Sequence, residues 1–333
     1  MLLERFVWAK AAEVRALRAA GRQGTLPTPF AGTRPSFTAA LRRGAAADGL
    51  AIIAEYKRAS PSRGLMCADV PPEAAALDYA AAGASCLSVL TEEKYFSGSL
   101  DFVNRAAAAL AAEIAPAGGD VLPCAAGETP SPLPLLRKDF IFSAEQVAAT
   151  AATRASALLL IVRMTPQVAL LRALREQAEA AGMEAVVEVF DAADLRLARA
   201  SGARLIQVNA RDLDSLRVDR EACVRLAEQY PPQAGECWIA ASGIDSAEQL
   251  LAVADAGFSA ALIGSAFMQG GRPGAALASL RERLAAMLAQ RQGISAANGR
   301  AARPAPEAAD AGISAVLHPA CTAATATAAV REA

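Results

Sequence analysis

The sequence predicts a (β/α)8 barrel of the TIM type that forms a single domain over residues 1–290. Eight short apolar runs alternate with Ala- and Leu-rich helical stretches from about residue 50 onward. Most of these runs follow a helix that ends in small residues and Gly, as in AAAGAS and ADAGFS, a typical C-cap before a buried strand. Near-continuous apolar strands separated by helices indicate a parallel sheet covered by helices, and eight such units suit a closed barrel.

Each apolar run is expected to form one strand of this barrel. No G-x-G-x-x-G follows any of them, which argues against a dinucleotide-binding sheet. The predicted strands are residues 50–57 (LAIIAEYK), 85–90 (SCLSVL), 134–139 (PLLRKD), 157–162 (ALLLIV), 185–190 (AVVEVF), 204–209 (RLIQVN), 237–242 (CWIAAS) and 260–265 (AALIGS).

Three segments are additions to the barrel. Residues 1–48 are expected to form a helical extension, made of an amphipathic helix, a loop with Pro and Gly, and a shorter helix. Residues 115–133 are rich in Pro, Gly and Ser and are predicted to be a loop insertion. Residues 291–333 form an Ala/Thr/Pro-rich, low-complexity tail, for which we expect disorder or weak helix.

The composition points to a soluble cytoplasmic protein. A net charge of -1 gives no electrostatic reason to expect nucleic acid or an anionic membrane as a partner. No apolar run reaches the roughly 18 residues of a membrane span, and the N-terminus lacks the layout of a secretory signal. The six cysteines are scattered without a Cys-x-x-Cys pair, which argues against a zinc site and suits a reducing compartment.

Histidine and lysine are both scarce, which narrows the chemistry. The only histidine, His318, lies in the tail, so histidine-ligated metals and histidine catalysis are not expected. Lysine can give up a proton and act as a general acid, whereas arginine stays charged. We therefore single out Lys57 and Lys138, which lie at polar strand ends, and attribute Lys10 and Lys94 to chance.

Barrels of this type build their active sites at the carboxyl ends of the strands. Glu55 and Lys57 lie at the end of the first predicted strand, Lys138 at the third and Glu188 at the fifth. Two carboxylates and two lysines would then converge on one cavity, which suits proton transfers on an anionic substrate. The alternative is a set of structural ion pairs, since an unpaired buried carboxylate is costly. The two interpretations can coexist, because such pairs also tune pKa values.

The last two strands predict a phosphate site. Ser242-Gly243 and Gly264-Ser265 each place Ser and Gly at a strand end before a helix, where exposed backbone N–H groups can bind an anion. Ser60 can add a hydroxyl to the same phosphate. The alternative is that these glycines only allow tight turns.

Four other residues have simpler interpretations. Phe6 and Trp8 are expected to pack the N-terminal helix onto the barrel, with a lid over the substrate as the alternative. Glu92 and Glu93 are expected to be solvated loop charges.

Together these motifs resemble one family, the indole-3-glycerol phosphate synthases, which carry out the decarboxylating ring closure of tryptophan biosynthesis. The motifs follow the family's order and spacing over roughly residues 2–290, and the N-terminal helices fit the extension that this family carries over its barrel mouth. The matching stretches are AEYKRASPSRG, LSVLTEEKYFSGSLDFV, PLLRKDFI, LLLIVR, EAVVEVFD, VNARDLDSLRVD, ASGI and LIGSAFM.

The resemblance implies a carboxy-lyase that needs no cofactor or metal. Its substrate would be the phosphorylated small molecule 1-(2-carboxyphenylamino)-1-deoxy-D-ribulose 5-phosphate, converted to indole-3-glycerol phosphate with loss of CO2 and water. By resemblance, Lys138 would be the general acid and Glu188 the general base. Lys57 would hold the carboxylate of the aromatic ring, and Glu55 would pair with the lysines.

The resemblance also implies how the substrate is held. Asn209 and Arg211 would orient its hydroxyls and carboxylate, and Phe140 would pack against its ring. The groups expected at the phosphate are Ser60, Gly243, Gly264 and Ser265, with Ser242 beside them. Association with other enzymes of the tryptophan pathway is left open.

Some positions depart from the family pattern. Ala241 replaces the usual Glu of a Glu-Ser-Gly motif, Gln207 replaces a Gly, and Phe190 replaces a His. The principal acid and base are present, so we expect activity. The alternatives are another phosphate-binding barrel enzyme of the phosphosugar isomerase type, or a catalytically weakened paralogue that acts as a partner subunit.

Overall fold

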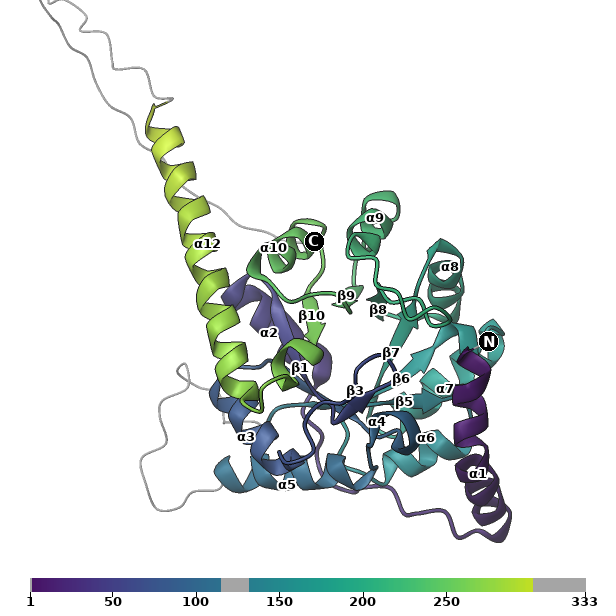
Figure 1. The fold of residues 1–333 in the computed structure, drawn as a ribbon. Helices are drawn as coiled ribbons and strands as arrows, with labels where there is room; N and C mark the ends of the chain where they lie inside the picture. Colours follow the sequence, from purple (N-terminus) through teal and green to yellow (C-terminus); the bar gives the residue numbers. More distant parts are fainter. Residues whose placement is uncertain (1, 115–131, 302–333) are drawn as a thin grey trace, which may run out of the picture. The chain divides into compact units, whose positions relative to one another are not determined.

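The computed structural model describes residues 2–114 and 132–301, and its centre is a closed barrel of parallel strands (Figure 1). The strands follow one another around the barrel in the order β1-β10-β9-β8-β7-β6-β5-β4, so the predicted (β/α)8 fold is confirmed. The barrel strands are β1 (Ala51–Tyr56), β4 (Cys86–Leu90), β5 (Leu135–Ile141), β6 (Ala157–Ile161), β7 (Glu184–Val189), β8 (Leu205–Asn209), β9 (Cys237–Ala241) and β10 (Ala260–Ile263). Each lies where an apolar run predicted it.

The apolar runs form strands because both of their faces are buried. In β8, Ile206 and Val208 belong to the core between the sheet and the surrounding helices, whereas Leu205 belongs to a second core inside the barrel. Successive side chains of a strand point to opposite faces, so one run supplies both cores. The same alternation directs Gln207 and Asn209 into the barrel, and only the residues near the carboxyl end reach its open mouth.

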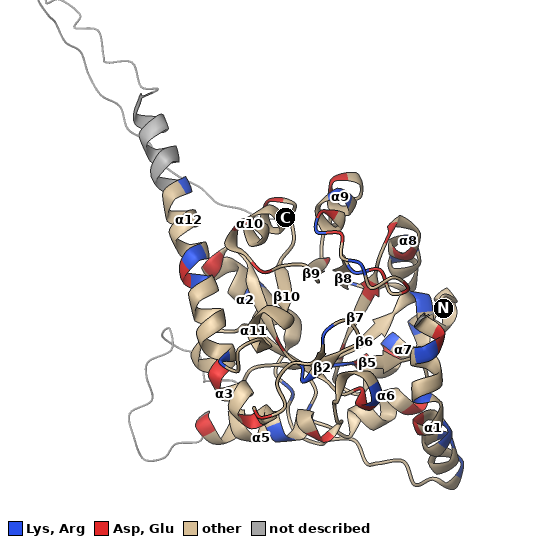
Figure 2. Ribbon diagram, viewed as in Figure 1, with Lys and Arg blue, Asp and Glu red and all other residues tan. Residues whose placement is uncertain are grey.

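Helices alternate with the strands and surround them (Figure 1). Their bounds are α1 (Leu2–Gln23), α2 (Phe37–Asp48), α3 (Pro72–Ala81), α4 (Glu93–Phe96), α5 (Asp101–Ile114), α6 (Ala144–Ala151), the 3₁₀ helix η1 (Val162–Met164), α7 (Val168–Ala180), α8 (Ala192–Ser201), α9 (Ala222–Gln229), α10 (Ala247–Asp255), α11 (Ser265–Met268) and α12 (Pro273–Ala301). A two-stranded hairpin, β2 (Ala59–Ser60) and β3 (Gly64–Leu65), follows β1. Basic and acidic residues are mixed on α9 and α12 (Figure 2).

The N-terminal extension has its two predicted helices, α1 and α2. Glu184, at the start of β7, accepts hydrogen bonds from the backbone N–H groups of Phe37 at 2.6 Å and Thr38 at 3.0 Å, and so anchors the beginning of α2. Phe6 on α1 is only 2% exposed, as predicted, but the packing prediction was wrong for Trp8, which is 75% exposed. Two residues along a helix turn a side chain by roughly 200°, so the two rings point in opposite directions.

The additions after α1 and α2 are only partly described. Of the predicted insertion at residues 115–133, residues 115–131 lie outside the described residues. The chain divides into one compact unit from Met1 to Ala289 and another from Gln290 to Ala333. Helix α12 continues to Ala301, so the start of the predicted tail is helical; residues 302–333 lie outside the described residues. No helix in the described ranges is long and apolar enough to cross a membrane.

Candidate active site

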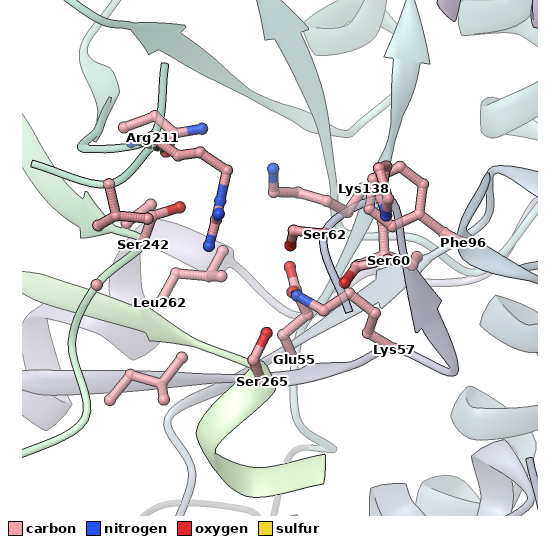
Figure 3. Close-up of a pocket in the computed structure, with 18 of the residues that line it drawn as sticks. Glu55, Lys57, Ser60, Ser62, Phe96, Lys138, Arg211, Ser242, Leu262 and Ser265 are labelled. Carbon is pink, nitrogen blue, oxygen red and sulfur yellow. Dashed lines mark hydrogen bonds and ion pairs between the residues drawn. The ribbon is translucent and has the colours of Figure 1, made fainter. Parts of the chain in front are cut away.

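A cavity of about 390 Å³ opens at the carboxyl ends of the barrel strands. All of the residues that the sequence predicted for the site line it, and Figure 3 shows several of them directed at the same space. The predicted residues in its wall are Glu55, Lys57, Ser60, Lys138, Phe140, Glu188, Asn209, Arg211, Ser242, Gly243, Gly264 and Ser265. Barrel closure is what brings these residues, more than 200 positions apart in some cases, into one wall.

Glu55 and Lys57 form an ion pair at the end of β1. Glu55 Oε1 lies 2.7 Å from Lys57 Nζ, and Ser88 Oγ donates to Glu55 Oε2 at 3.3 Å. Burial by itself would raise the pKa of Glu55, but the charges of Lys57 and Lys138 outweigh it and the pKa is lowered. Glu55 is therefore a carboxylate that holds the Lys57 ammonium at the cavity wall. The ion pair is present, and its place in the cavity wall is compatible with the active-site interpretation.

Lys138 and Glu188 form the second pair. Lys138 Nζ on β5 lies 3.4 Å from Glu188 Oε2 on β7, and both side chains line the cavity. Gln207 Nε2 on β8 donates a hydrogen bond to the same Oε2 atom. The sequence identified Gln207 only as a departure from the family pattern. Its contact with Glu188 depends on the neighbouring positions of β7 and β8, which pair Glu188 with Gln207 in register.

A buried ionic cluster lies next to Lys138. Asp139 Oδ2 is 3.0 Å from Lys10 Nζ, 2.8 Å from Arg137 Nη2 and 2.6 Å from Thr91 Oγ1. Burial raises the pKa of the Asp139 carboxyl, but the charges of Arg137 and Lys10 and the hydrogen bonds from Thr91 and Arg137 lower it to about 2. Attributing Lys10 to chance was wrong, since its ammonium ties α1 to β5.

An aromatic wall faces the cavity above this cluster. The Phe6 ring from α1 stacks on the Phe140 ring with centroids 4.1 Å apart and an interplanar angle of 13°, and the Phe96 ring lies 6.2 Å from that of Phe140. All three side chains line the cavity. The sequence predicted Phe140 as the ring that packs against the substrate, whereas Phe6 was expected to pack α1 onto the barrel, with a lid over the substrate as the alternative. The docking of α1 and α4 against Phe140 is not specified by any local pattern. A planar apolar ligand fits such a wall.

Arg211 supplies a cation on another side of the cavity (Figure 3). Asn209 Oδ1 accepts a hydrogen bond from the Arg211 backbone N–H at 3.0 Å, which fixes the turn after β8. Arg211 Nη1 donates to the backbone carbonyl of Leu216 at 2.9 Å. Burial lowers the pKa of Arg211 below its ordinary value, but a guanidinium remains charged at neutral pH.

The Ser-Gly turns shape a third part of the wall. Gly243 has φ 77°, and a Cβ there would lie 2.6 Å from Val218 Cγ1, so glycine is needed for this turn. Gly264 has an ordinary φ, but a Cβ there would lie 2.4 Å from Glu55 Oε1. Ser60 Oγ is buried and accepts or donates no hydrogen bond within the described part of the chain. A buried hydroxyl without a partner is costly, which suits a ligand that supplies one.

Glu92 was wrongly expected to be a solvated charge. It is only 1% exposed and lines the cavity, and its carboxylate accepts hydrogen bonds from the backbone N–H groups of Lys94, Tyr95 and Phe96 at 2.7–3.1 Å. It therefore caps α4, the short helix that carries Phe96. Glu93 is exposed, as predicted. Among the residues that the structure describes, no three His, Cys, Asp or Glu side chains gather as metal ligands would.

Comparisons with known proteins identify the family to which the chain is similar. The chain matches the family "Indole-3-glycerol phosphate synthase" over residues 3–280. A protein of that name from Chloroherpeton thalassium is 41% identical over 228 residues, which cover 68% of this chain and 78% of the relative. Another of that name, from Desulfotalea psychrophila, is 36% identical over 280 residues, which cover 84% of this chain and 98% of the relative.

Proposed function

Because this chain belongs to the indole-3-glycerol phosphate synthase family and is a decarboxylating lyase of tryptophan biosynthesis, we propose that Lys138 is its general acid and Glu188 its general base. The substrate would be 1-(2-carboxyphenylamino)-1-deoxy-D-ribulose 5-phosphate and the product indole-3-glycerol phosphate. The observation that carries the assignment is the Lys138–Glu188 pair, 3.4 Å apart in the cavity wall. An ammonium donor beside a carboxylate acceptor supplies both halves of an acid–base reaction.

The reaction divides between these two groups. The Lys138 ammonium donates to the ribulose carbonyl oxygen while the ring carbon that bears the carboxylate attacks the carbonyl carbon. Loss of CO2 returns the electron pair to the ring and restores its aromaticity. Lys138, reprotonated from solvent, then gives a proton to the new hydroxyl, which leaves as water. Glu188 takes the proton from the carbon next to nitrogen, which completes the indole.

The substrate carboxylate needs a cation that stays in place until CO2 leaves. Lys57 fits this role because Glu55, a buried carboxylate of lowered pKa, holds its ammonium at 2.7 Å. Arg211 and Asn209 would orient the hydroxyls and the carboxylate from the β8 side. The anthranilate ring would lie against Phe140.

The phosphate would bind at the Ser-Gly turns. Ser60 offers a buried hydroxyl without a partner among the described residues, and Gly264 and Gly243 form turns where a Cβ would collide with its neighbours. The backbone N–H groups of these turns would be the donors to the phosphate. Ser265 adds a second hydroxyl at the cavity wall, and Ser242 lies beside them. These groups and the lysine pairs are parts of one cavity, so a single substrate can reach both.

One assay tests the proposed function. Purified protein is mixed with the carboxyphenylamino substrate, and indole formation is followed by fluorescence together with release of CO2. We expect both signals in equal amounts. Absence of both at high enzyme concentration would contradict the lyase assignment. A very weak signal would instead favour the weakened paralogue, for which Ala241, a cavity residue without a carboxylate, is the supporting feature.

The cytoplasm is the proposed location, because the described cysteines are free thiols, as a reducing compartment allows. Association with other enzymes of the tryptophan pathway is part of the same proposal. Cell fractionation tests the first and co-purification from the native cell tests the second. Recovery of the protein in an envelope fraction would contradict the cytoplasmic location. Purification as a lone chain at native concentration would contradict the association.

A further inference from the structure

Gln207 is a polar side chain inside the barrel, below the cavity. It is 0% exposed and is not part of the cavity wall, so the substrate does not reach it. It lies on β8 directly opposite Glu188 of β7, and its Nε2 donates a hydrogen bond to Glu188 Oε2. Gln207 Oε1 is buried and has no hydrogen-bond partner in the described ranges. A buried amide with one unused group needs a reason, because its burial costs free energy.

The two donors on Glu188 act on one oxygen. Lys138 Nζ on β5 and Gln207 Nε2 on β8 both contact Oε2, and the two strands lie on opposite sides of β7 in the barrel. Two contacts on Oε2 limit rotation of the carboxylate about its last bond. Glu188 Oε1 accepts no hydrogen bond from the described residues, so it is the oxygen left for a substrate proton.

We propose that Gln207 is a positioning residue for the general base, an inference that rests on the proposed role of Glu188. It holds Oε2 so that Oε1 stays directed at the substrate carbon. Glu188 would take the substrate proton on Oε1, so Oε2 remains an acceptor and the Gln207 Nε2–H can hold it in both protonation states. No apolar side chain of the same size can donate this hydrogen bond.

The test compares turnover with substrate affinity. Gln207→Met keeps the side-chain volume and removes the hydrogen bond. We expect kcat to fall about tenfold, the size of a lost hydrogen bond to a charged group, while KM changes less than about twofold. Ile239→Met is the matched control, since Ile239 pairs with Gln207 from β9 inside the same barrel layer and does not line the cavity. Its kcat is expected to stay within about twofold of wild type.

A double-mutant cycle separates positioning from packing. In a Glu188→Gln background, Gln207→Met should reduce the residual kcat no further, because the group it positions is absent. An equal fold-loss in both backgrounds would overturn the inference. Gln207→Asn keeps the amide but withdraws it by one methylene from Glu188. This variant replaces Gln207→Met in the test if the Met variant does not fold. A folded Gln207 variant with wild-type kcat would also overturn the inference.

Failure of the proposed function gives a different pattern. If Glu188→Gln keeps wild-type turnover, Glu188 is not the base and the premise fails. If Glu188→Gln loses turnover while folded Gln207→Met keeps it, the premise stands and only the role of Gln207 fails. Circular dichroism of each variant verifies the fold.

Discussion

The ammonium of Lys10 on α1 lies 3.0 Å from the carboxylate of Asp139, the residue after the proposed acid Lys138. This contact joins the N-terminal helix to the strand that carries the proposed catalytic lysine. It also places Phe6 against Phe140, with ring centroids 4.1 Å apart. The N-terminal extension is therefore part of the active-site wall, and changes in α1 should affect both stability and substrate binding.

Asp139→Asn should destabilise the fold. The carboxylate is the shared partner of Lys10 and Arg137, and its removal leaves two buried cations without it. We expect a loss of about 3–5 kcal/mol in the free energy of unfolding, measured in urea. Glu221→Gln, an exposed carboxylate on the surface, is the control and should change it by less than about 0.5 kcal/mol. Equal stabilities for the two variants would contradict the buried cluster.

The same carboxylate predicts a pH dependence of stability. The pKa of Asp139 is about 2 in the folded protein against an ordinary 3.8, so the unfolded chain binds the proton more tightly. The contribution is fully present above about pH 4 and is lost as the pH falls through 2; it amounts to roughly 2 kcal/mol. Urea unfolding between pH 5 and 2 measures it. The free energy of unfolding of Asp139→Asn should depend less steeply on pH than that of the wild type. An identical pH dependence in the two proteins would argue against the lowered pKa.

Lys138→Met should remove the general acid. We expect kcat to fall by about 10²–10⁴, with the fold intact by circular dichroism. Lys138→Arg should not restore it, since a guanidinium does not release its proton at neutral pH. Lys94→Met is the control, because Lys94 is exposed on α4 outside the cavity wall. Near-normal turnover of the Met variant would refute the assignment.

Phe6→Ala should weaken substrate binding. The change removes the ring stacked on Phe140 and opens the aromatic wall, so KM should rise about five- to tenfold, in line with the energy of an aromatic pair. Steady-state kinetics at several substrate concentrations measure it. Trp8→Ala lies two residues away on the exposed side of α1 and should leave KM unchanged. An equal rise of KM in both variants would mean that α1 affects substrate binding through the stability of the fold and not through the Phe6 ring.

Gly264→Ala should impair the site although no backbone strain is involved. The added Cβ would lie 2.4 Å from Glu55 Oε1, so either the β10 turn or the Glu55–Lys57 pair must move. We expect kcat/KM to fall by about tenfold or more, the cost of overpacking a closed site. Gly21→Ala on α1, whose new Cβ would meet nothing nearer than 3.6 Å, should have normal kinetics. Normal kinetics for Gly264→Ala would show that the turn or the Glu55 side chain can move without loss of activity, which would contradict the prediction.

Much of the site follows from the chain itself once the fold is known. Glu55, Lys57, Lys138 and Glu188 all lie at or near the carboxyl ends of apolar runs, and barrel topology directs such ends to one cavity. The positions of the strands can be predicted because an apolar run and the Gly that caps the preceding helix are both local features of the sequence. The polar strand ends are local for the same reason.

The tertiary structure alone decided which distant residues meet. Lys10 and Asp139 are 129 positions apart, and no pattern in either segment indicates their contact. Gln207 contacts Glu188 because β7 and β8 pair in that register, and Glu92 is buried because its carboxylate caps the N-terminus of α4. The sequence by itself determined the barrel and the strand ends that line its cavity, since these depend on hydrophobic period. Long-range pairs and the exposed or buried side of a helix depend on how the closed barrel and its helices pack, which no local pattern contains.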